Sequence, residues 1–444
     1  MFTADDDARP IAFRHGSAVL LRQFRRDVAA IARGLPARGA MIDLCEDRYR
    51  FIAAYSAAAL SGHTVLLPPT RAEQVVAEVN AAHAGSYLID DAAVDAAFAE
   101  RGSGEQNPWL GRETDARADI APDHVVMIGF TSGSTGQPKR HPKLWRSVAA
   151  SNQCNADAIR EALKEDVRGL TPWIVATVPP QHMYGMELSV LLPLAGGMAV
   201  HAGRPLFPAD IAEALNEVPE PRVLVSTPVH LRAIVDSSQA FPPVAVVVCA
   251  TAPLDQALAR AVEQKLGATL LEMFGSTETC VFATRLTAHE RRWRLYPGVA
   301  LTPQADGTLV NAPWFAAPNL LQDIVELEGQ RHFTVLGRNV DMIDVAGKRA
   351  SLSDLTRRLL AIEGVKDAAV FQPDSESVAT IRRVAALVVA PGLTTREILE
   401  RLAPGVDPAF LPRPLVLVDA LPRNEVGKLP RDALLRALKR GPNN

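Results

Sequence analysis

The stretch Phe130-Thr-Ser-Gly-Ser-Thr-Gly-Gln-Pro-Lys139 packs four hydroxyl side chains, two glycines and a lysine into ten residues, directly after the apolar run His124-Val-Val-Met-Ile-Gly129. Glycine lets backbone N–H groups approach a ligand closely, and the hydroxyls with the ammonium group complete a cradle for a polyphosphate. The stretch is not the P-loop of the NTPases, because a proline precedes the lysine and no Ser or Thr follows it. By itself such a cluster is equally typical of a solvated surface loop. The candidate phosphate-binding residues are Thr131, Ser132, Gly133, Ser134, Thr135, Gly136 and Lys139.

The bulk composition limits the class of protein. A chain of 444 residues exceeds one ordinary hydrophobic core, so we expect two or three domains. Its 48% hydrophobic and 22% charged residues are normal for a soluble globular protein, and a net charge of −3 gives no electrostatic case for nucleic acid. The four cysteines have no CxxC spacing, which argues against a disulfide framework or a zinc site.

Targeting signals are not evident. The start of the sequence is acidic and has no apolar core of a signal peptide, and no uncharged apolar run reaches the roughly 18 residues that a membrane span requires. We therefore expect no membrane insertion and a cytoplasmic localisation.

Helical and strand patterns alternate along most of the chain, which predicts an α/β fold with parallel sheets covered by helices. In the first part, Ser17 is the expected N-cap of the first helix. The expected helices are 17–35, 48–60, 71–82, 186–194 and 254–266, and the expected strands are 63–68, 86–90, 173–178, 223–226, 244–248 and 269–274.

Shorter strands and turns begin near Gly307, and a small α+β unit begins near Gly337. We predict a large N-terminal domain, 1–337, with parallel sheets and a distorted β unit, and a small mobile α+β domain, 338–444. The expected elements of the small domain are helices 353–362, 395–402 and 431–440 and strands 365–371, 384–389 and 415–418.

Four further segments carry candidate chemistry. The first places a glycine turn, a hydroxyl and a carboxylate after a strand, and the second places an acid after a proline-rich approach. The third puts an arginine at the expected domain junction, and the fourth puts a lysine on a glycine-bearing loop. They are Met273-Phe-Gly-Ser-Thr-Glu-Thr279, Leu321-Gln-Asp323, Gly337-Arg-Asn-Val-Asp-Met-Ile-Asp-Val-Ala-Gly-Lys348 and Leu421-Pro-Arg-Asn-Glu-Val-Gly-Lys428-Leu-Pro-Arg.

At these five segments the chain resembles the adenylate-forming superfamily, which includes acyl- and aryl-CoA synthetases, peptide-synthetase adenylation domains and luciferases. The resemblance covers essentially the whole chain, with the segments in the same order. The compact length and the segments Cys45-Glu-Asp-Arg-Tyr-Arg-Phe51 and Gly62-His-Thr-Val-Leu-Leu-Pro-Pro69 are similar to AMP ligases of aryl-polyene (xanthomonadin-type) pathways.

The resemblance implies a role for each nucleotide-binding residue. Residues 131–139 would hold the β- and γ-phosphates of ATP, Thr277 would hydrogen-bond the α-phosphate, and Glu278 would hold Mg²⁺. Phe274, beside Gly275, would stack on adenine where many relatives have Tyr.

The resemblance also assigns the ribose and the catalytic lysine. Asp323 and Arg338 would bind the ribose hydroxyls, which suits a carboxylate that accepts two hydrogen bonds. Lys428 would reach between the carboxylate and the α-phosphate, and Gly347 would line a channel for the thiol arm of CoA or phosphopantetheine.

The acid pocket is the least defined part of the implied site. His182 would gate it, and its mostly apolar lining with a few hydroxyls suits a small aryl acid such as a hydroxybenzoate, or a short acyl chain. The candidate pocket residues are Met183, Tyr184, Ser226, Ala250, Thr251, Met273 and Cys280.

The residues also differ from the family pattern at several points. Many relatives have an Asp or Lys as hinge two residues after the arginine, where this chain has Val340, followed by Asp341. A side chain at Thr251 stands where relatives often have glycine, and only the acid of the usual Thr-Gly-Asp remains, as Asp323.

The chemistry agrees with an AMP-forming acid–thiol ligase. A carboxylate that attacks the α-phosphate must overcome repulsion between anions, which Mg²⁺ and lysines reduce, and it needs no general base because it is already ionised. ATP and a carboxylic acid would give an acyl-adenylate and pyrophosphate, and a thiol of CoA or an acyl carrier protein would then release AMP.

Two alternatives stay open at this stage. The chain could be an adenylating enzyme that stops at the acyl-AMP or transfers it to an amine, or a non-catalytic adenylate-binding protein. Retention of Lys139, Lys428 and Glu278 argues against the second. Taken singly, Glu278 and Asp323 could be turn or cap acids, Lys428 a solvated cation, Arg338 a hinge ion-pair residue and His182 a loop histidine.

Overall fold

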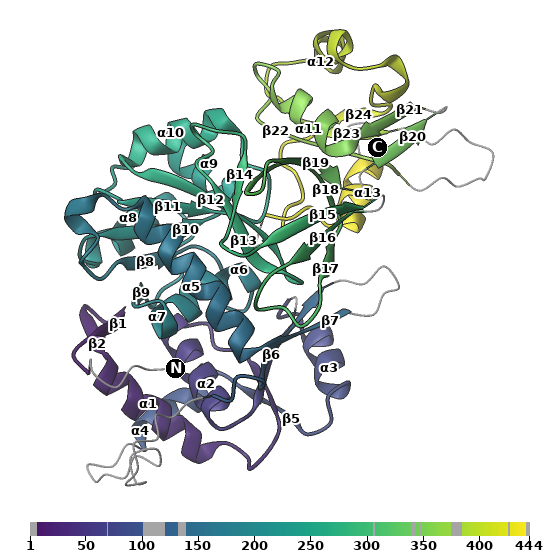
Figure 1. Cartoon of the computed structure of the whole chain (residues 1–444). Coiled ribbons are helices and arrows are strands. Elements are labelled where there is room, and N and C mark those ends of the chain that lie inside the picture. Colours follow the sequence, from purple (N-terminus) through teal and green to yellow (C-terminus); the bar gives the residue numbers. More distant parts are fainter. Residues whose placement is uncertain are drawn as a thin grey trace. The chain divides into compact units, whose positions relative to one another are not determined.

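A computed structural model describes residues 7–68, 70–100, 120–131, 139–304, 307–338, 342–345, 348–373, 384–424 and 427–440 (Figure 1). The chain divides into two compact units. The first comprises Met1–Val299 with Ala312–Ala316, and the second comprises Ala300–Asn311 with Ala317–Asn444. The domain boundary predicted between residues 337 and 338 marks the expected start of a mobile lid. This boundary stays a prediction.

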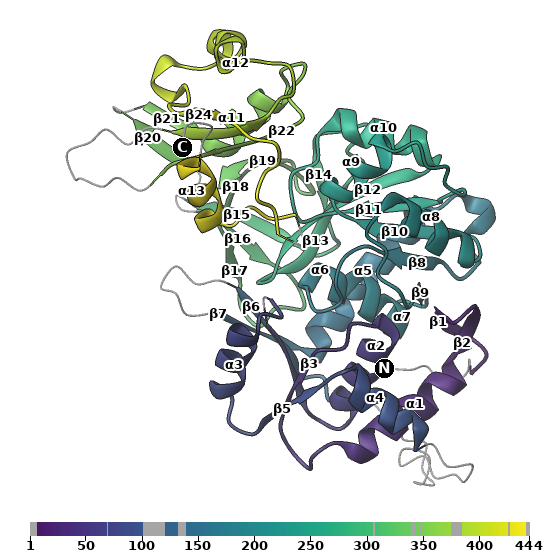
Figure 2. The same ribbon diagram turned by 180° about the vertical axis from the view of Figure 1, so that it is seen from behind.

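The first sheet of the first unit has the strand order β5-β3-β4-β6-β7. Its strands run parallel except for β7, which returns antiparallel to β6. Helices α1, α2 and α4 cover one face and α3 covers the other, as the two opposite views show (Figures 1 and 2). These elements are α1 (Leu21–Gly34), β3 (Ala40–Asp43), α2 (Arg48–Leu60), β4 (Thr64–Leu67), α3 (Glu73–Ala81), β5 (Ser86–Ile89), α4 (Asp91–Ala99), β6 (Val125–Thr131) and β7 (Lys139–Leu144).

The second sheet of this unit has the order β14-β13-β12-β11-β10-β8-β9-β1-β2, with a parallel centre from β12 to β1. Every second residue of its central strands, such as Val175, Leu224 and Val247, packs into a core with helices α8, α9 and α10. The strands are β1 (Pro10–Arg14), β2 (Ser17–Leu20), β8 (Trp173–Ala176), β9 (Ala199–His201), β10 (Arg222–Ser226), β11 (Val246–Cys249), β12 (Thr269–Ser276), β13 (Cys280–Arg285) and β14 (Trp293–Leu295). The helices are α5 (Trp145–Ala162), α8 (Pro208–Glu217), α9 (Pro228–Asp236) and α10 (Gln256–Leu266).

The α/β prediction is confirmed, but the first predicted helix begins four residues too early. Ser17 does not cap a helix: it opens β2, which pairs with β1 in a hairpin, and the helix begins at Leu21. His15 and Gly16 at the tip both have positive φ, which suits a two-residue hairpin turn. Strand pairing therefore overrides the helical spacing of apolar residues over 17–20.

The predicted helix 186–194 is present in altered form. A short α-turn, α6 (Met183–Gly185), leads into a π-helical segment, η2 (Met186–Leu191), and then into α7 (Leu192–Ala195). A Cβ at Gly185 would lie 2.0 Å from the carbonyl oxygen of Pro179, so this tight entry requires glycine. π-Turns of this kind are frequent at functional sites.

The second unit contains small antiparallel sheets and one mixed sheet. Alternate residues of the mixed sheet face two cores: Ala368 and Val370 pack with α11 and α12, while Ala369 and Phe371 pack with α13. The sheets are β15 (Ala300–Gln304), β16 (Gly307–Asn311) and β17 (Asn319–Leu321); β18 (Asp323–Glu328) and β19 (His332–Arg338); β20 (Met342–Val345) and β21 (Lys348–Ser351); and β22 (Asp367–Phe371), β23 (Ala385–Val389) and β24 (Leu415–Leu417). The helices are α11 (Leu352–Leu360), α12 (Thr395–Leu402) and α13 (Arg431–Lys439).

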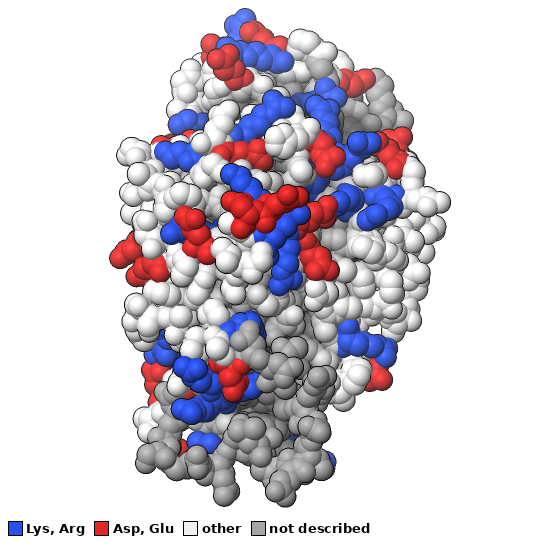
Figure 3. All heavy atoms as spheres, turned by 60° about the vertical axis from the view of Figure 1, so that its left-hand side comes forward, with Lys and Arg blue, Asp and Glu red and all other residues white. Residues whose placement is uncertain are grey.

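Charged side chains of both signs are interspersed on the face drawn in Figure 3. This face shows no broad area of a single sign among the described residues, in keeping with the small net charge. In the part of the chain that the structure describes, no helix combines the length and the apolar character that crossing a bilayer would need.

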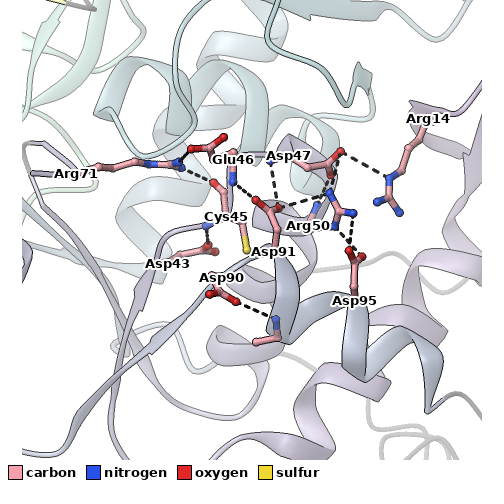
Figure 4. A network of polar contacts seen from close by, with 11 residues as sticks. Arg14, Asp43, Cys45, Glu46, Asp47, Arg50, Arg71, Asp90, Asp91 and Asp95 are labelled. Carbon is pink, nitrogen blue, oxygen red and sulfur yellow. Dashed lines mark hydrogen bonds and ion pairs between the residues drawn. The ribbon is translucent and has the colours of Figure 1, made fainter. Parts of the chain in front are cut away.

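Arginines and acids tie down the loop between β3 and α2 (Figure 4). The backbone N–H groups of Glu46 and Asp47 donate to Asp91, and Arg50 forms a two-point ion pair with Asp95 at 2.8 and 2.7 Å. We call this set the loop network; its members are Arg14, Asp43, Cys45, Glu46, Asp47, Arg50, Arg71, Asp91 and Asp95.

Candidate functional site

The predicted phosphate loop connects two neighbouring strands of the first sheet. Thr131 ends β6, Lys139 begins β7, and these two residues are cross-strand partners. Both ends of the loop therefore leave the sheet at the same place. The candidates Ser132, Gly133, Ser134, Thr135 and Gly136 lie outside the described residues.

The segment with Thr277 and Glu278 is a tight hairpin turn between β12 and β13. Ser276 and Cys280 are paired, so Thr277–Thr279 forms the loop. The hydroxyl of Thr279 accepts from the backbone N–H of Ser276 at 3.0 Å, and that of Ser276 accepts from the N–H of Thr279 at 3.2 Å. These reciprocal bonds fix the loop that carries the two candidate side chains.

Gly275 is required by the close approach of the two strands at this turn. A Cβ there would lie 2.1 Å from the carbonyl oxygen of Cys280, which a larger residue cannot avoid. The register shifts between Phe274 and Gly275, and Cys280 has a φ of 58°. The glycine that the sequence marks as a tight turn is thus a bulge that brings two backbones together.

Gly129 brings three predicted parts of the site into one place. A Cβ at this position would lie 2.9 Å from Cγ2 of Thr277 and 3.5 Å from Sδ of Met183. The strand that leads into the phosphate loop therefore packs against the Thr277–Thr279 turn and against α6, which carries candidates for the acid pocket. Glycine in a strand interior commonly marks such an approach.

His141 links the phosphate loop to Glu278. Its Nε2 lies 2.9 Å from the hydroxyl of Thr131 and 3.5 Å from Oε1 of Glu278. Burial, followed by the charges of Lys143 and Lys139, lowers the pKa of His141 despite the opposing effect of Glu278. The imidazole is therefore a neutral hydrogen-bonding group at neutral pH.

Glu278 itself stays ionised. Burial acts to raise its pKa, but hydrogen bonds from Ser276 and the backbone outweigh burial, together with the charge of Lys143 and the charge that His141 gains at acidic pH. The pKa of Glu278 therefore lies below its ordinary value. An ionised, half-buried carboxylate at the end of the phosphate-loop strands is suited to a divalent cation.

Two charged residues next to this turn lie outside the motifs used for prediction. Lys143 is 6% exposed, and its Nζ donates to the backbone oxygen of Glu278. Glu187, on η2, is 3% exposed, and its Oε2 accepts from the N–H of Val281 at 3.0 Å. We call His141, Lys143, Glu187 and Glu278 the turn cluster. His141 and Lys143 are two residues apart on a strand, so their side chains share one face of the sheet, and this spacing could have indicated Lys143 from the sequence. No comparable sequence pattern indicates Glu187, which lies in the π-helical segment.

Phe274 lies half-buried among aromatic rings. Its centroid is 5.4 Å from that of Phe282 and 4.9 Å from that of Trp293. The ring that the resemblance implies for adenine stacking is therefore held in place from within the second sheet.

The acid-pocket candidates gather at the carboxyl ends of parallel strands. Ser226 ends β10, Ala250 and Thr251 follow β11, and Met273 lies in β12, so they share one edge of the sheet. The hydroxyl of Tyr184 lies 3.1 Å from the carbonyl oxygen of Ser226 and 3.0 Å from that of Val248. Tyr184 thus ties α6 to two strands.

A hydroxyl–imidazole group stands at the same edge and was missed by sequence reasoning. The Thr177 hydroxyl lies 2.8 Å from Nδ1 of His230 and 3.1 Å from the hydroxyl of Ser226. His182, the predicted gate, has a local task as well, because its Nδ1 accepts from the backbone N–H of Tyr184 at 3.3 Å and so caps α6.

In the second unit, the two ribose candidates stand opposite each other. Asp323 and Arg338 are cross-strand partners of β18 and β19. Asp323 is 6% exposed, and its backbone oxygen accepts from the Thr308 hydroxyl at 2.7 Å. The side chain of Arg338 and the residues Gly347, Val340 and Asp341 lie outside the described part.

Lys428 is presented by a turn that Asn424 closes. The backbone N–H of Lys428 donates to Oδ1 of Asn424, and the N–H of Asn424 donates to the carbonyl of Lys428, both at 2.8 Å. Lys428 is exposed, and Gly427 before it has a φ of 77°. The turn fixes the backbone and leaves the long side chain outside the core.

Comparison with known proteins identifies the family. A family model described as AMP-binding enzyme matches residues 18–312. This chain belongs to the AMP-binding enzyme family. It is 31% identical over 331 residues to a 4-coumarate–CoA ligase of Halorhodospira halophila, which covers 72% of this chain and 79% of the relative. It is 26% identical over 356 residues to a p-hydroxybenzoic acid–AMP ligase of Mycobacterium marinum, which covers 70% of this chain and 49% of that protein.

Solved structures share the fold. The amide bond synthetase McbA from Marinactinospora thermotolerans superposes with a TM-score of 0.78 at 20% identity, over 98% of both chains. The superfamily and the α/β class expected from the sequence are therefore confirmed, with an AMP-forming, acyl-CoA-synthetase-like enzyme as the class of protein.

The carboxylate of Glu278 fits the Mg²⁺ ion that is predicted from the sequence. Among the described residues, no three His, Cys, Asp or Glu side chains gather as a metal-binding group. Mg²⁺ is commonly held by one or two carboxylates together with substrate phosphates, so a single acid close to the predicted phosphate loop is a suitable donor.

Proposed function

We propose that this enzyme is an AMP-forming carboxylate–thiol ligase for a small aryl acid. In the first step, ATP and the acid give an acyl-adenylate and pyrophosphate. In the second, a thiol attacks the acyl carbon and AMP leaves. The observation that carries the proposal is the meeting of β6, the Thr277–Thr279 turn and α6 at Gly129, since it brings phosphate-loop, α-phosphate and acid-pocket candidates together within one compact unit.

The proposed nucleotide roles are those that the family resemblance implies, and the donor and acceptor types of the residues agree with them. Thr131, Lys139 and the residues between them would hold the β- and γ-phosphates, and Thr277 would donate to the α-phosphate. Glu278 would hold Mg²⁺, which supplies charge neutralisation at the phosphates. Phe274 would stack on adenine, and Gly275 beside it would belong to the same nucleotide site.

The second unit carries the candidates for the ribose and for the attack of the carboxylate. Asp323 and Arg338 would bind the ribose, and Lys428 would stabilise the negative charge that develops as the carboxylate attacks the α-phosphate. We propose that residues 338–444 act as a mobile lid, with Gly347 lining the path of the thiol arm in the second step.

The acid would be aryl, such as a hydroxybenzoate, or a short acyl chain. Relatives named for 4-coumarate and p-hydroxybenzoic acid favour an aromatic acid. Apolar Met183, Ala250 and Met273 would contact the ring, and polar Ser226 and Thr251 would select its substituents. The acceptor would be CoA or a carrier-protein phosphopantetheine in the cytoplasm.

The test is a pyrophosphate-release screen over aryl and short fatty acids, with CoA and a phosphopantetheinylated carrier protein as alternative acceptors. We expect acid-dependent pyrophosphate release and a thioester product. Lys428→Ala should reduce pyrophosphate release at least about 100-fold while ATP binding persists, because it removes charge stabilisation from the transition state alone. Lys366→Ala, at another exposed lysine of the second unit, is the matched control. Wild-type release in Lys428→Ala would contradict this role.

An amide-forming or adenylate-releasing enzyme is the second candidate, since an amide bond synthetase shares the fold over nearly the whole chain. Pyrophosphate release without any thioester, and an amide product when amines are supplied, would favour it. ATP binding without pyrophosphate release from any acid would instead favour a binding protein.

A further inference from the structure

A cation and a carboxylate are buried together behind the turn that carries Thr277 and Glu278. Lys143 comes from β7 and Glu187 from η2, segments that are far apart in the chain. Neither residue belongs to a motif that the proposed function uses. Burying either charge is costly unless hydrogen bonds and an opposite charge compensate, so both positions need a physical reason.

Lys143 holds the turn from the side of β7. Its Nζ donates to the carbonyl of Glu278, the central residue of the turn. Its charge also lies close enough to Glu278 and Glu187 to act on the pKa of both carboxyls, and it faces the thiol of Cys280. An ammonium group bonded to a turn carbonyl fixes where the neighbouring Glu278 and Thr277 side chains begin.

Glu187 holds the other side of the same turn. Its Oε2 accepts from the N–H of Val281, which comes one residue after the paired Cys280. The same oxygen accepts from Nδ2 of Asn155 at 3.3 Å, and Oδ1 of Asn155 accepts from the hydroxyl of Tyr296 at 2.8 Å. The carboxyl is thus anchored on α5.

The backbone of Glu187 is anchored as well, and this links the turn to α6. Its carbonyl accepts from Nδ2 of Asn152 at 2.9 Å. Glu187 lies two residues after Gly185, the last residue of α6, on the same continuous helical stretch as Met183 and Tyr184. Burial raises the pKa of Glu187 to about 7, against the opposing effects of its hydrogen bonds and of Lys143.

We propose that Lys143 and Glu187 are positioning residues for adenylation: they grip the Thr277–Thr279 turn at Glu278 and Val281 and set Thr277 and Glu278 against the nucleotide. The inference rests on the proposed function for the identity of the reaction. The grip itself depends only on two bonds to backbone atoms, the Lys143 bond to Glu278 in the turn and the Glu187 bond to Val281 in β13. When a side chain that contacts the transition state is displaced by about 1 Å, the reaction rate can fall about 100-fold. Loss of either bond to the backbone should therefore have a measurable effect on the rate.

The test compares matched substitutions in the full chain. Lys143→Met and Glu187→Met remove the two grips and retain apolar bulk. Glu187→Gln is the conservative variant, since its amide oxygen can still accept from Val281. Arg222→Met is the control, because Arg222 also donates to backbone carbonyls, those of Leu215 and Val218, from a side chain that is 13% exposed but at another place in the unit.

Three measurements are made on each variant: thermal midpoint, amide hydrogen exchange of peptides that cover 276–282, and ATP–pyrophosphate exchange as a function of ATP, acid and Mg²⁺. In Lys143→Met and Glu187→Met we expect faster amide exchange at the turn and kcat/KM for ATP lower by about 10–100-fold. Glu187→Gln should recover most of the rate, and Arg222→Met should keep kcat/KM within about twofold at a comparable thermal midpoint.

Failure of the inference and failure of the proposed function differ in this design. A wild type active in ATP–pyrophosphate exchange, with Lys143→Met and Glu187→Met as active as Arg222→Met, would overturn the inference alone. A wild type inactive with every acid would contradict the proposed function. In that case, unchanged amide exchange at the turn would overturn the grip, and faster exchange would support it.

Discussion

The loop network and the turn cluster place similar residues in different surroundings. Arg50 and Asp95 of the loop network form an ion pair in which the carboxylate side chain is 51% exposed. Lys143 and Glu187 of the turn cluster are almost fully buried and bond to backbone atoms of another segment. Water screens the exposed pair of the loop network. The buried charges of the turn cluster have lost their hydration, so protein hydrogen bonds and opposite charges must compensate for it. We infer that the loop network adjusts local stability and that the turn cluster fixes geometry at the site.

The largest effect should come from Arg48, which lies between Asp47 and Arg50 of the loop network in sequence but is fully buried. Its guanidinium donates at 2.9 Å to the carbonyls of Ala176 and Val178 and also to the hydroxyl of Ser189. Arg48→Met removes the hydrogen bonds to both buried carbonyls and to Ser189, so the free energy of unfolding should fall by about 2–4 kcal/mol in chemical denaturation. Arg50→Met, two residues along the same helix, is the control. Equal losses would contradict the contrast between buried and exposed arginines.

Glu278→Gln should have the largest effect on the magnesium dependence of the reaction. It removes the charge that we assign to Mg²⁺ and retains the shape of the side chain, so kcat/KM for Mg·ATP should fall by about 100-fold, with a higher Mg²⁺ requirement. The readout is ATP–pyrophosphate exchange across a magnesium titration. Asp95→Asn is the matched change in the loop network and should leave the titration unaltered. An unchanged magnesium dependence in Glu278→Gln would refute the metal assignment.

Asp43 is the one buried acid of the loop network as defined above and should make stability depend on pH. Burial raises its pKa to about 8 from 3.8, against hydrogen bonds from Cys45 and the charge of Arg71. Between these two values the folded protein keeps a proton that the unfolded chain releases. The free energy of unfolding should therefore fall as pH rises from about 4 to 8, by up to about 1.4 kcal/mol per pH unit.

Asp43→Asn removes this titration. Its Oδ1 can still accept from the N–H of Cys45, as the carboxyl does at 3.0 Å. Denaturant unfolding of both proteins at several pH values should give curves that converge at low pH, with the variant the more stable at pH 8. Parallel curves would show that Asp43 titrates normally in the folded state.

The smallest effect belongs to the exposed pair. A double-mutant cycle with Arg50→Ala and Asp95→Ala should give a coupling energy of about 0.5 kcal/mol in thermal or chemical unfolding, and less in high salt. A coupling energy above about 2 kcal/mol would show that this exposed pair interacts as strongly as buried charges do. It would contradict the contrast between the loop network and the turn cluster.

Local spacing was a good guide where one element carries its own signal. Helix Arg48–Leu60 and helix Thr395–Leu402 have the bounds expected from the sequence, since each begins after a residue that caps it, Asp47 and Thr394. The same rule was wrong at Ser17, where pairing with β1 extends the chain. It also missed the π-turn at Glu187, which shifts the side chains out of helical register.

The amino-acid sequence by itself determined the α/β class and the family, and it is the basis for the proposed phosphate, metal and ribose residues, because these stand in short segments whose residue types and order are specific. Only the tertiary structure decided which groups meet: Lys143 and the Glu278 carbonyl are 135 residues apart, and Glu187 and Val281 are 94 apart. Contacts at such separations arise from strand order and from glycines that permit close approach, as at Gly129. No local pattern encodes them, since the free energy that forms them is the burial of the whole unit.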